Sequence, residues 1–198
     1  EFVAVLAIPL TVGFTIMAKQ CILLLSGNAY LPSVVPMCII MPTLILIGAS
    51  NVFGVQMLVP LGKETIVLYS EIAGAVADII LNAIFIPRFG AAGAAFGTLV
   101  AEAVVLAVQA VALKDMAWEI IRKIEIGKIL AAVVVAGGVM MVIRDRLNAG
   151  VFLMLVVCFG VFCGIYGGML LIMRERILCE ILETIGKRIG RQESERKL

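Results

Sequence analysis

The feature that most constrains the fold is a series of long apolar runs that hold almost no charged residues. Six such runs can be marked along the sequence, and the connections between them and the C-terminal tail carry all but one of the lysines and arginines. A helix needs about 20 apolar residues, with a rise of about 1.5 Å each, to cross a hydrocarbon core of about 30 Å. The sequence therefore predicts an all-α, polytopic transmembrane helix bundle with about six spans.

Composition favours a membrane protein over a soluble one. Of the 198 residues, 63% are hydrophobic and 15% are charged, whereas soluble domains are about half apolar and about a quarter charged. A single soluble core could not bury this surplus, so we expect much of it to face lipid.

The predicted spans cover residues 2–25, 33–58, 65–86, 91–113, 129–143 and 151–173. The fifth is only marginally long enough to cross the bilayer. The connections 26–32, 61–64 and 87–90 are short, so neighbouring helices are expected to be antiparallel hairpins. Residues 1–173 then form one transmembrane lobe. Because the chain lacks an initiator methionine, we expect it to be a fragment of a longer protein.

Two further segments are amphipathic rather than spanning. Residues 114–128 and the basic tail 174–198 place isoleucines at helical spacing among Lys, Arg and Glu. Both are predicted to be helices on the cytoplasmic membrane surface. Beyond Gly190 the apolar periodicity ends, and a solvated charged tail is an equal alternative.

The distribution of Lys and Arg predicts the orientation. With a cytoplasmic N-terminus, the outer side keeps only Arg88, Arg144 and Arg146 outside the spans, while Lys63, the 114–128 connection and the tail fall inside. The positive-inside rule then places both ends of the chain in the cytoplasm.

Several functional classes are disfavoured by residue content. Histidine is absent, the five cysteines form no CxxC pair, and the net charge is only +2. We therefore expect no metal or cofactor site, no nucleic-acid partner and no enzymatic activity.

Polar residues inside the third predicted span recur every three or four positions, at Glu71, Gly74, Asp78 and Asn82. This spacing places them on one helical face, which must meet other helices or a wet cavity because charge is costly in lipid. These residues are predicted to line a cavity or couple an ion.

Glu102 is an acidic residue in the apolar fourth span. Asp78 lies twelve residues before Gly90, and Glu102 lies twelve residues after it. Both should therefore lie about 18 Å from the turn. The two carboxylates are predicted to share a proton or hold Na⁺ as the coupling ion. The alternative is that each bonds separately to a neighbouring helix.

Other intramembrane residues have weaker interpretations. Lys19 either snorkels to the headgroups or contacts substrate, and Asn51 and Gln56 are candidate substrate-facing residues on the second span. That span is expected to be irregular because of its Pro, Gly and polar residues. The small-residue ridge at Gly93, Gly97 and Ala101 is expected to permit close helix packing.

The stretch NAIFIPRFGAAGAAFGTLVAE, residues 82–102, resembles the hairpin of polysaccharide (O-antigen and capsule) flippases of the multidrug/oligosaccharidyl-lipid/polysaccharide exporter superfamily. In that hairpin a helix ends in Asn, Ile-Pro, a basic residue and Gly, and restarts with Gly-Ala-Ala. The matching hairpin residues are Asn82, Pro87, Arg88, Gly90, Gly93 and, further along, Glu102. Pro9 and the stretches 24–33 and 59–64 are also similar to the C-terminal half of this family.

The resemblance implies the C-terminal lobe of a transporter with 12–14 helices, in a bacterial or archaeal cytoplasmic membrane. The cargo would be an undecaprenyl-diphosphate-linked oligosaccharide, moved from the inner to the outer leaflet by alternating access coupled to H⁺ or Na⁺. Expected partners are this substrate, membrane lipids, the N-terminal lobe and other envelope-assembly proteins. The six helices alone are expected not to transport.

Two other functions compete with this interpretation. A multidrug or cation antiporter of the same superfamily would share the architecture, and its acidic cavity would suit Glu71, Asp78 and Glu102. A membrane polysaccharide polymerase is less favoured, because this chain has short external connections and no histidine.

Overall fold

A computed structural model describes residues 2–114, 116, 122, 125–147 and 149–173. The described residues form helices joined by short turns, with no strand among them. Five helical segments are long and apolar enough to cross a membrane, and a bent pair at the N-terminus makes a sixth if it counts as one span. The chain is therefore an all-α, multi-pass membrane protein, as its apolar runs predict.

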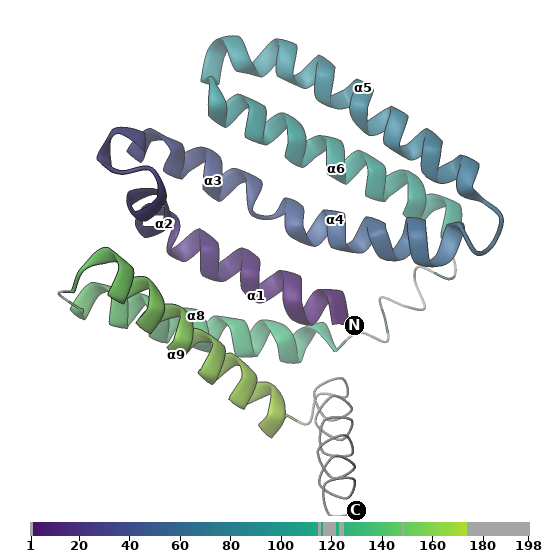
Figure 1. Ribbon diagram of the computed structural model, residues 1–198. Helices are drawn as coiled ribbons and strands as arrows, with labels where there is room; N and C mark the ends of the chain where they lie inside the picture. Colours follow the sequence, from purple (N-terminus) through teal and green to yellow (C-terminus); the bar gives the residue numbers. More distant parts are fainter. Residues whose placement is uncertain (1, 115, 117–121, 123–124, 148, 174–198) are drawn as a thin grey trace, which may run out of the picture.

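The helices lie side by side in a stack (Figure 1). At one edge, α5 (Glu64–Phe89) packs on α6 (Ala91–Leu113). Next come α3 (Val34–Ile40) and α4 (Thr43–Asn51), then α1 (Phe2–Ile16). At the other edge, α8 (Ile126–Arg146) packs on α1 and on α9 (Val151–Ile172). Helices joined by short connections, such as α5 with α6 and α8 with α9, are antiparallel hairpins, as the short connections predict.

The first predicted span is broken, which corrects the expectation of one helix over residues 2–25. Helix α1 ends at Ile16, α2 (Ala18–Leu25) follows, and the two axes are bent by 72°. Arg144 of α8 donates a hydrogen bond from Nη1 to the Ile16 carbonyl, at 3.2 Å. A guanidinium at the C-terminal carbonyls of α1 stabilises the helix end and its dipole.

The second span is irregular, as its composition predicts. It consists of a 3₁₀ helix η1 (Asn28–Ser33), then α3, α4 and a π-helix η2 (Val52–Leu58). Pro42 has no N–H to donate, so the ladder is interrupted between α3 and α4. Hydroxyls bond the carbonyls beside the break, from Thr43 to Ile40 at 2.6 Å and from Thr11 to Met41 at 3.2 Å.

Two other predicted boundaries need correction. The fifth span, expected over 129–143, is a full helix from Ile126 to Arg146. The expected connection 87–90 is helical as far as Phe89, because the fixed φ of Pro87 suits a helix and only one ladder bond is lost. Gly90 alone makes the turn, at φ 57°, where a side chain would be strained.

Apolar residues divide between a packed interior and the lipid-facing surface. The main core lies between α1, α2, α8 and α9, where Met17, Ile129, Met140 and Leu170 are fully buried. The outer face of α5 is apolar and exposed, with Ile79 at 69%. This exposed apolar surface is what lipid contact requires.

The expected amphipathic connection 114–128 lies mostly outside the described residues, and the tail 174–198 lies wholly outside them.

Candidate functional site

The α5–α6 hairpin brings two polar helix faces together because small residues allow close approach. Gly93, Gly97 and Ala101 are buried on α6, and a Cβ at Gly93 would collide with the Phe85 carbonyl of α5. A Cβ at Gly74 would likewise collide with Val105. These are the contacts expected of a small-residue ridge.

Asp78 and Asn82 face α6 near the middle of this hairpin. Thr98 donates a hydrogen bond from Oγ1 to Asp78 Oδ1, at 3.4 Å. The side chain of Asn82 lies over Gly97, and its Oδ1 is buried without a hydrogen-bond partner among the described residues. The predicted polar stripe therefore faces another helix rather than lipid at these two positions.

Glu71 and Glu102 lie in a separate cavity of about 160 Å³, and neither Asp78 nor Asn82 lines it. Four elements form its wall: α4, η2, α5 and α6. The lining residues are Ile47, Ser50, Asn51, Gly54, Val55, Val67, Glu71, Glu102 and Gln109. No lysine or arginine is among them.

Asp78 and Glu102, the two carboxylates expected to pair, therefore lie in different surroundings. Asp78 is bonded to Thr98, which precedes Glu102 by one helical turn on α6. Glu102 therefore lies farther from the Gly90 turn than Asp78 does. Glu102 lines the cavity together with Glu71, whereas Asp78 does not. The structure therefore brings Glu102 together with Glu71 at the cavity.

Gln109 is the principal cavity residue that the sequence interpretation missed. It is 1% exposed, and its Nε2 donates to Ser70 Oγ at 3.0 Å. Its Oε1 has no partner among the described residues. Gly54 makes room for it, because a Cβ there would lie 3.0 Å from Gln109 Nε2. A usable signal existed: Gln109 follows Glu102 by seven residues, which puts both on one helical face.

The candidate substrate-facing residues lie in different places. Asn51 lines the cavity. Gln56 is exposed on η2 and does not line it, and Lys19 is exposed on α2, away from the cavity.

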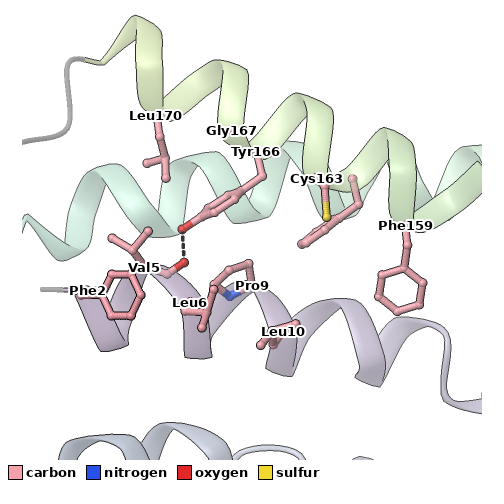
Figure 2. A pocket seen from close by; sticks show the side chains of 11 residues that line it. Phe2, Val5, Leu6, Pro9, Leu10, Phe159, Cys163, Tyr166, Gly167 and Leu170 are labelled. Atoms are coloured by element: carbon pink, nitrogen blue, oxygen red, sulfur yellow. Dashed lines mark hydrogen bonds between the residues drawn. The ribbon is translucent and has the colours of Figure 1, made fainter. Parts of the chain in front are cut away.

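A second hollow of about 280 Å³ lies between α1 and α9 (Figure 2). Its lining is almost wholly apolar, with Phe2, Leu6 and Pro9 facing Phe159 and Cys163. At its inner wall Tyr166 donates a hydrogen bond from Oη to the Val5 carbonyl, at 2.7 Å (Figure 2). In an uninterrupted α-helix the N–H of residue 9 would bond the Val5 carbonyl, but Pro9 has no N–H.

Fold and cavity together define a multi-pass α-helical membrane protein with an acidic, amide-bearing cavity between α4, η2, α5 and α6, where Glu71 and Asn51 are exposed and Gln109 is buried. Comparison with protein-family models, with curated proteins and with solved structures returned no match to this chain. The resemblance to polysaccharide flippases thus stays a prediction from the hairpin residues. Among the described residues, no group of three or more His, Cys, Asp or Glu side chains is placed to hold a metal ion.

Proposed function

We propose that this chain is part of a transporter that moves an undecaprenyl-diphosphate-linked oligosaccharide from the inner to the outer leaflet. The observation that carries the proposal is the polar cavity around Glu71, Glu102 and Gln109, within helices whose other faces are apolar. Intramembrane acids are costly and are typical of substrate or ion pathways. Broken spans such as α1–α2 and α3–α4–η2 are also typical of transporters that alternate between two states.

The cargo class rests on the hairpin resemblance over residues 82–102. Movement from the inner to the outer leaflet rests on the same resemblance. Coupling to H⁺ or Na⁺ would involve the acids of α5 and α6, and the diphosphate would be bound by basic residues of an N-terminal lobe.

A multidrug or cation exporter is the second candidate, and one observation favours it. The cavity is lined by two acids and by no basic residue, so a cationic cargo would be attracted where an anionic diphosphate would be repelled. In this case the acids would bind the cargo itself.

Complementation tests the two functions. The full-length gene would be supplied to a capsule- or O-antigen-producing strain of matching glycan that lacks its flippase. We expect surface polysaccharide to return, and to be lost again with Glu102→Gln at normal protein levels. Glu64→Gln is the matched control, because Glu64 is an exposed acid at the first residue of α5. No return of polysaccharide, with raised resistance to cationic dyes, would assign the protein to the multidrug class.

A further inference from the structure

We infer that the hollow between α1 and α9 binds one acyl chain of an anionic phospholipid of the inner leaflet. This inference goes beyond the proposed transport function and does not depend on it. Its basis is the shape of the hollow, the chemistry of its walls, its depth in the bundle and the charge that follows α9 in the sequence.

The hollow has a buried floor and an exposed rim (Figure 2). Three residues of α9 form the floor: Phe162, Tyr166 and Leu170. Exposed residues form the rim: Phe2, Leu6, Leu10 and Cys163. At one end Phe159 packs on Phe14 of α1, with ring centroids 5.0 Å apart, so the two helices are in contact there. A ligand can therefore enter from the side, between the helices.

The walls offer carbon rather than polar atoms. The Tyr166 hydroxyl, which reaches the hollow from α9, is already bonded to the Val5 carbonyl at 2.7 Å. The other side chains that line the hollow are aliphatic or aromatic, apart from the Cys163 thiol. A headgroup or a sugar would lose its hydrogen bonds to water on entering, at a large cost. A hydrocarbon chain has no such bonds to lose.

Enclosure would hold the chain in this site. Lipid tails are as apolar as leucine, so protein–lipid contacts in a bilayer depend on van der Waals packing rather than on the hydrophobic effect. A chain in the hollow would contact two helices, whereas a chain on the outer face of α5 would contact one. The volume of about 280 Å³ is close to the lower limit of about 300 Å³ for small-molecule sites.

The depth of the hollow matches one leaflet. From Phe159 to Leu170 the lining of α9 rises about 16 Å, which is close to half of a hydrocarbon core about 30 Å thick. Leu170 lies near the end of α9 that the positive-inside rule assigns to the cytoplasm. The inner leaflet therefore supplies the chain. An undecaprenyl chain is much longer than one leaflet is thick, so most of it would lie outside the hollow.

Charge beside the hollow favours an anionic headgroup. Helix α9 ends at Ile172, and the sequence continues after Met173 with Arg174, Glu175 and Arg176. Chain length alone keeps Arg176 within about 14 Å of Ile172. Each basic residue near an anionic lipid surface strengthens binding by about fivefold, and this short stretch is basic on balance.

The test is quenching of a tryptophan in the hollow by phosphatidylglycerol that is brominated on its acyl chains. The purified full-length protein would be held in dodecyl maltoside micelles, with Trp118→Phe and any other native tryptophan replaced likewise. Phe159→Trp places a tryptophan in the hollow, and Val76→Trp places one on the exposed face of α5 near mid-span.

We expect saturable quenching of Phe159→Trp, half complete at a lipid concentration at least about tenfold lower than for Val76→Trp. About a dozen extra carbon contacts suffice for that ratio. Brominated phosphatidylcholine should require about fivefold more lipid than phosphatidylglycerol, because its headgroup has no net charge.

A second variant fills the hollow without a clash. Gly167 lines the hollow, and a Cβ added there meets nothing within 4 Å. Gly167→Leu should therefore occupy the site, abolish the saturable quenching and remove any rise in Tm that phosphatidylglycerol causes. Gly160→Leu is the matched control on the same helix, because its Cβ is equally free and Gly160 does not line the hollow.

Any of four results would overturn the inference. Equal quenching of the two tryptophans would indicate ordinary lipid contact, and no quenching of Phe159→Trp would mean that another part of the full-length chain covers the hollow. Unchanged quenching with Gly167→Leu would place the lipid elsewhere. Displacement of the brominated lipid by less undecaprenyl phosphate than unbrominated phosphatidylglycerol would assign the hollow to an isoprenoid chain. Failure of complementation by the full-length gene would refute glycan transport and leave the lipid site standing.

Discussion

At the residue scale, Tyr166 replaces a hydrogen bond that Pro9 removes. A proline inside a helix leaves the carbonyl four residues earlier without its usual donor, and in a membrane no water compensates for the loss. The Tyr166 hydroxyl reaches across from α9 to the Val5 carbonyl of α1. One side chain therefore both satisfies α1 and fixes how α9 packs on it.

We predict that Tyr166→Phe destabilises the protein by about 1 kcal/mol, since the Val5 carbonyl is left unbonded in an apolar site. In a Pro9→Ala background the new N–H of residue 9 can bond that carbonyl, so the same Tyr166→Phe change should cost close to nothing. Denaturant unfolding in detergent micelles measures all four proteins. An equal cost of Tyr166→Phe in both backgrounds would mean that the hydroxyl matters for another reason.

At the element scale, the α5–α6 hairpin depends on the glycines along the contact between its helices as well as on its turn. Gly93 lies against the Phe85 backbone, and a backbone cannot move aside as a flexible side chain can. The close approach carries Asp78 to Thr98 and Ser70 to Gln109, so the polar contacts of the site depend on this packing.

We predict that Gly93→Ala separates the two helices and destabilises the protein by about 1–3 kcal/mol, the range for overpacking a well-packed contact. The matched control is Gly160→Ala on α9, where an added Cβ meets nothing within 4 Å. That change should be neutral or slightly stabilising, because alanine lowers the entropy of the unfolded chain. The measurement is again unfolding in micelles, and equal effects of the two changes would contradict the close packing at Gly93.

Much of the element scale could be predicted from the sequence. Hydropathy located the spans, and the Gly93, Gly97 and Ala101 spacing indicated the packing ridge. The break at Met17 could not be predicted, because no proline or glycine stands there, and a contact from Arg144, distant in sequence, bonds the helix end. For Gln109, the spacing from Glu102 could have indicated the helical face but not the contacts, because Ser70 and Gly54 come from two other elements.

At the scale of the whole molecule, the bundle has two ends that differ in charge outside the spans. The turns at Leu61 and Lys63, the end of α6 and the start of α8 lie at one end (Figure 1). Gly90 and the α8–α9 connection, which contains Ala149, lie at the other. The first end is the one that the positive-inside rule assigns to the cytoplasm.

We predict this orientation to hold in cells. In a background without the five native cysteines, Ala149→Cys should react with a membrane-impermeant maleimide in intact cells. Leu61→Cys should react only after the membrane is permeabilised. Neither substitution changes a charge, so neither disturbs the bias that sets the topology. Labelling in the reverse pattern would contradict the predicted orientation.

The π-helix η2 has a consequence for how the cavity could respond to its ligand. In η2 backbone bonds run to the fifth residue, as from Val59 N–H to the Gly54 carbonyl at 3.0 Å, where an α-helix would use the fourth. Rewinding this one stretch as an α-helix would rotate Ser50 and Asn51 about the helix axis relative to Leu58. Rewinding η2 would therefore turn the side chains of Ser50 and Asn51 toward or away from Glu71 and Glu102. The ends of the span would stay at the same membrane surfaces.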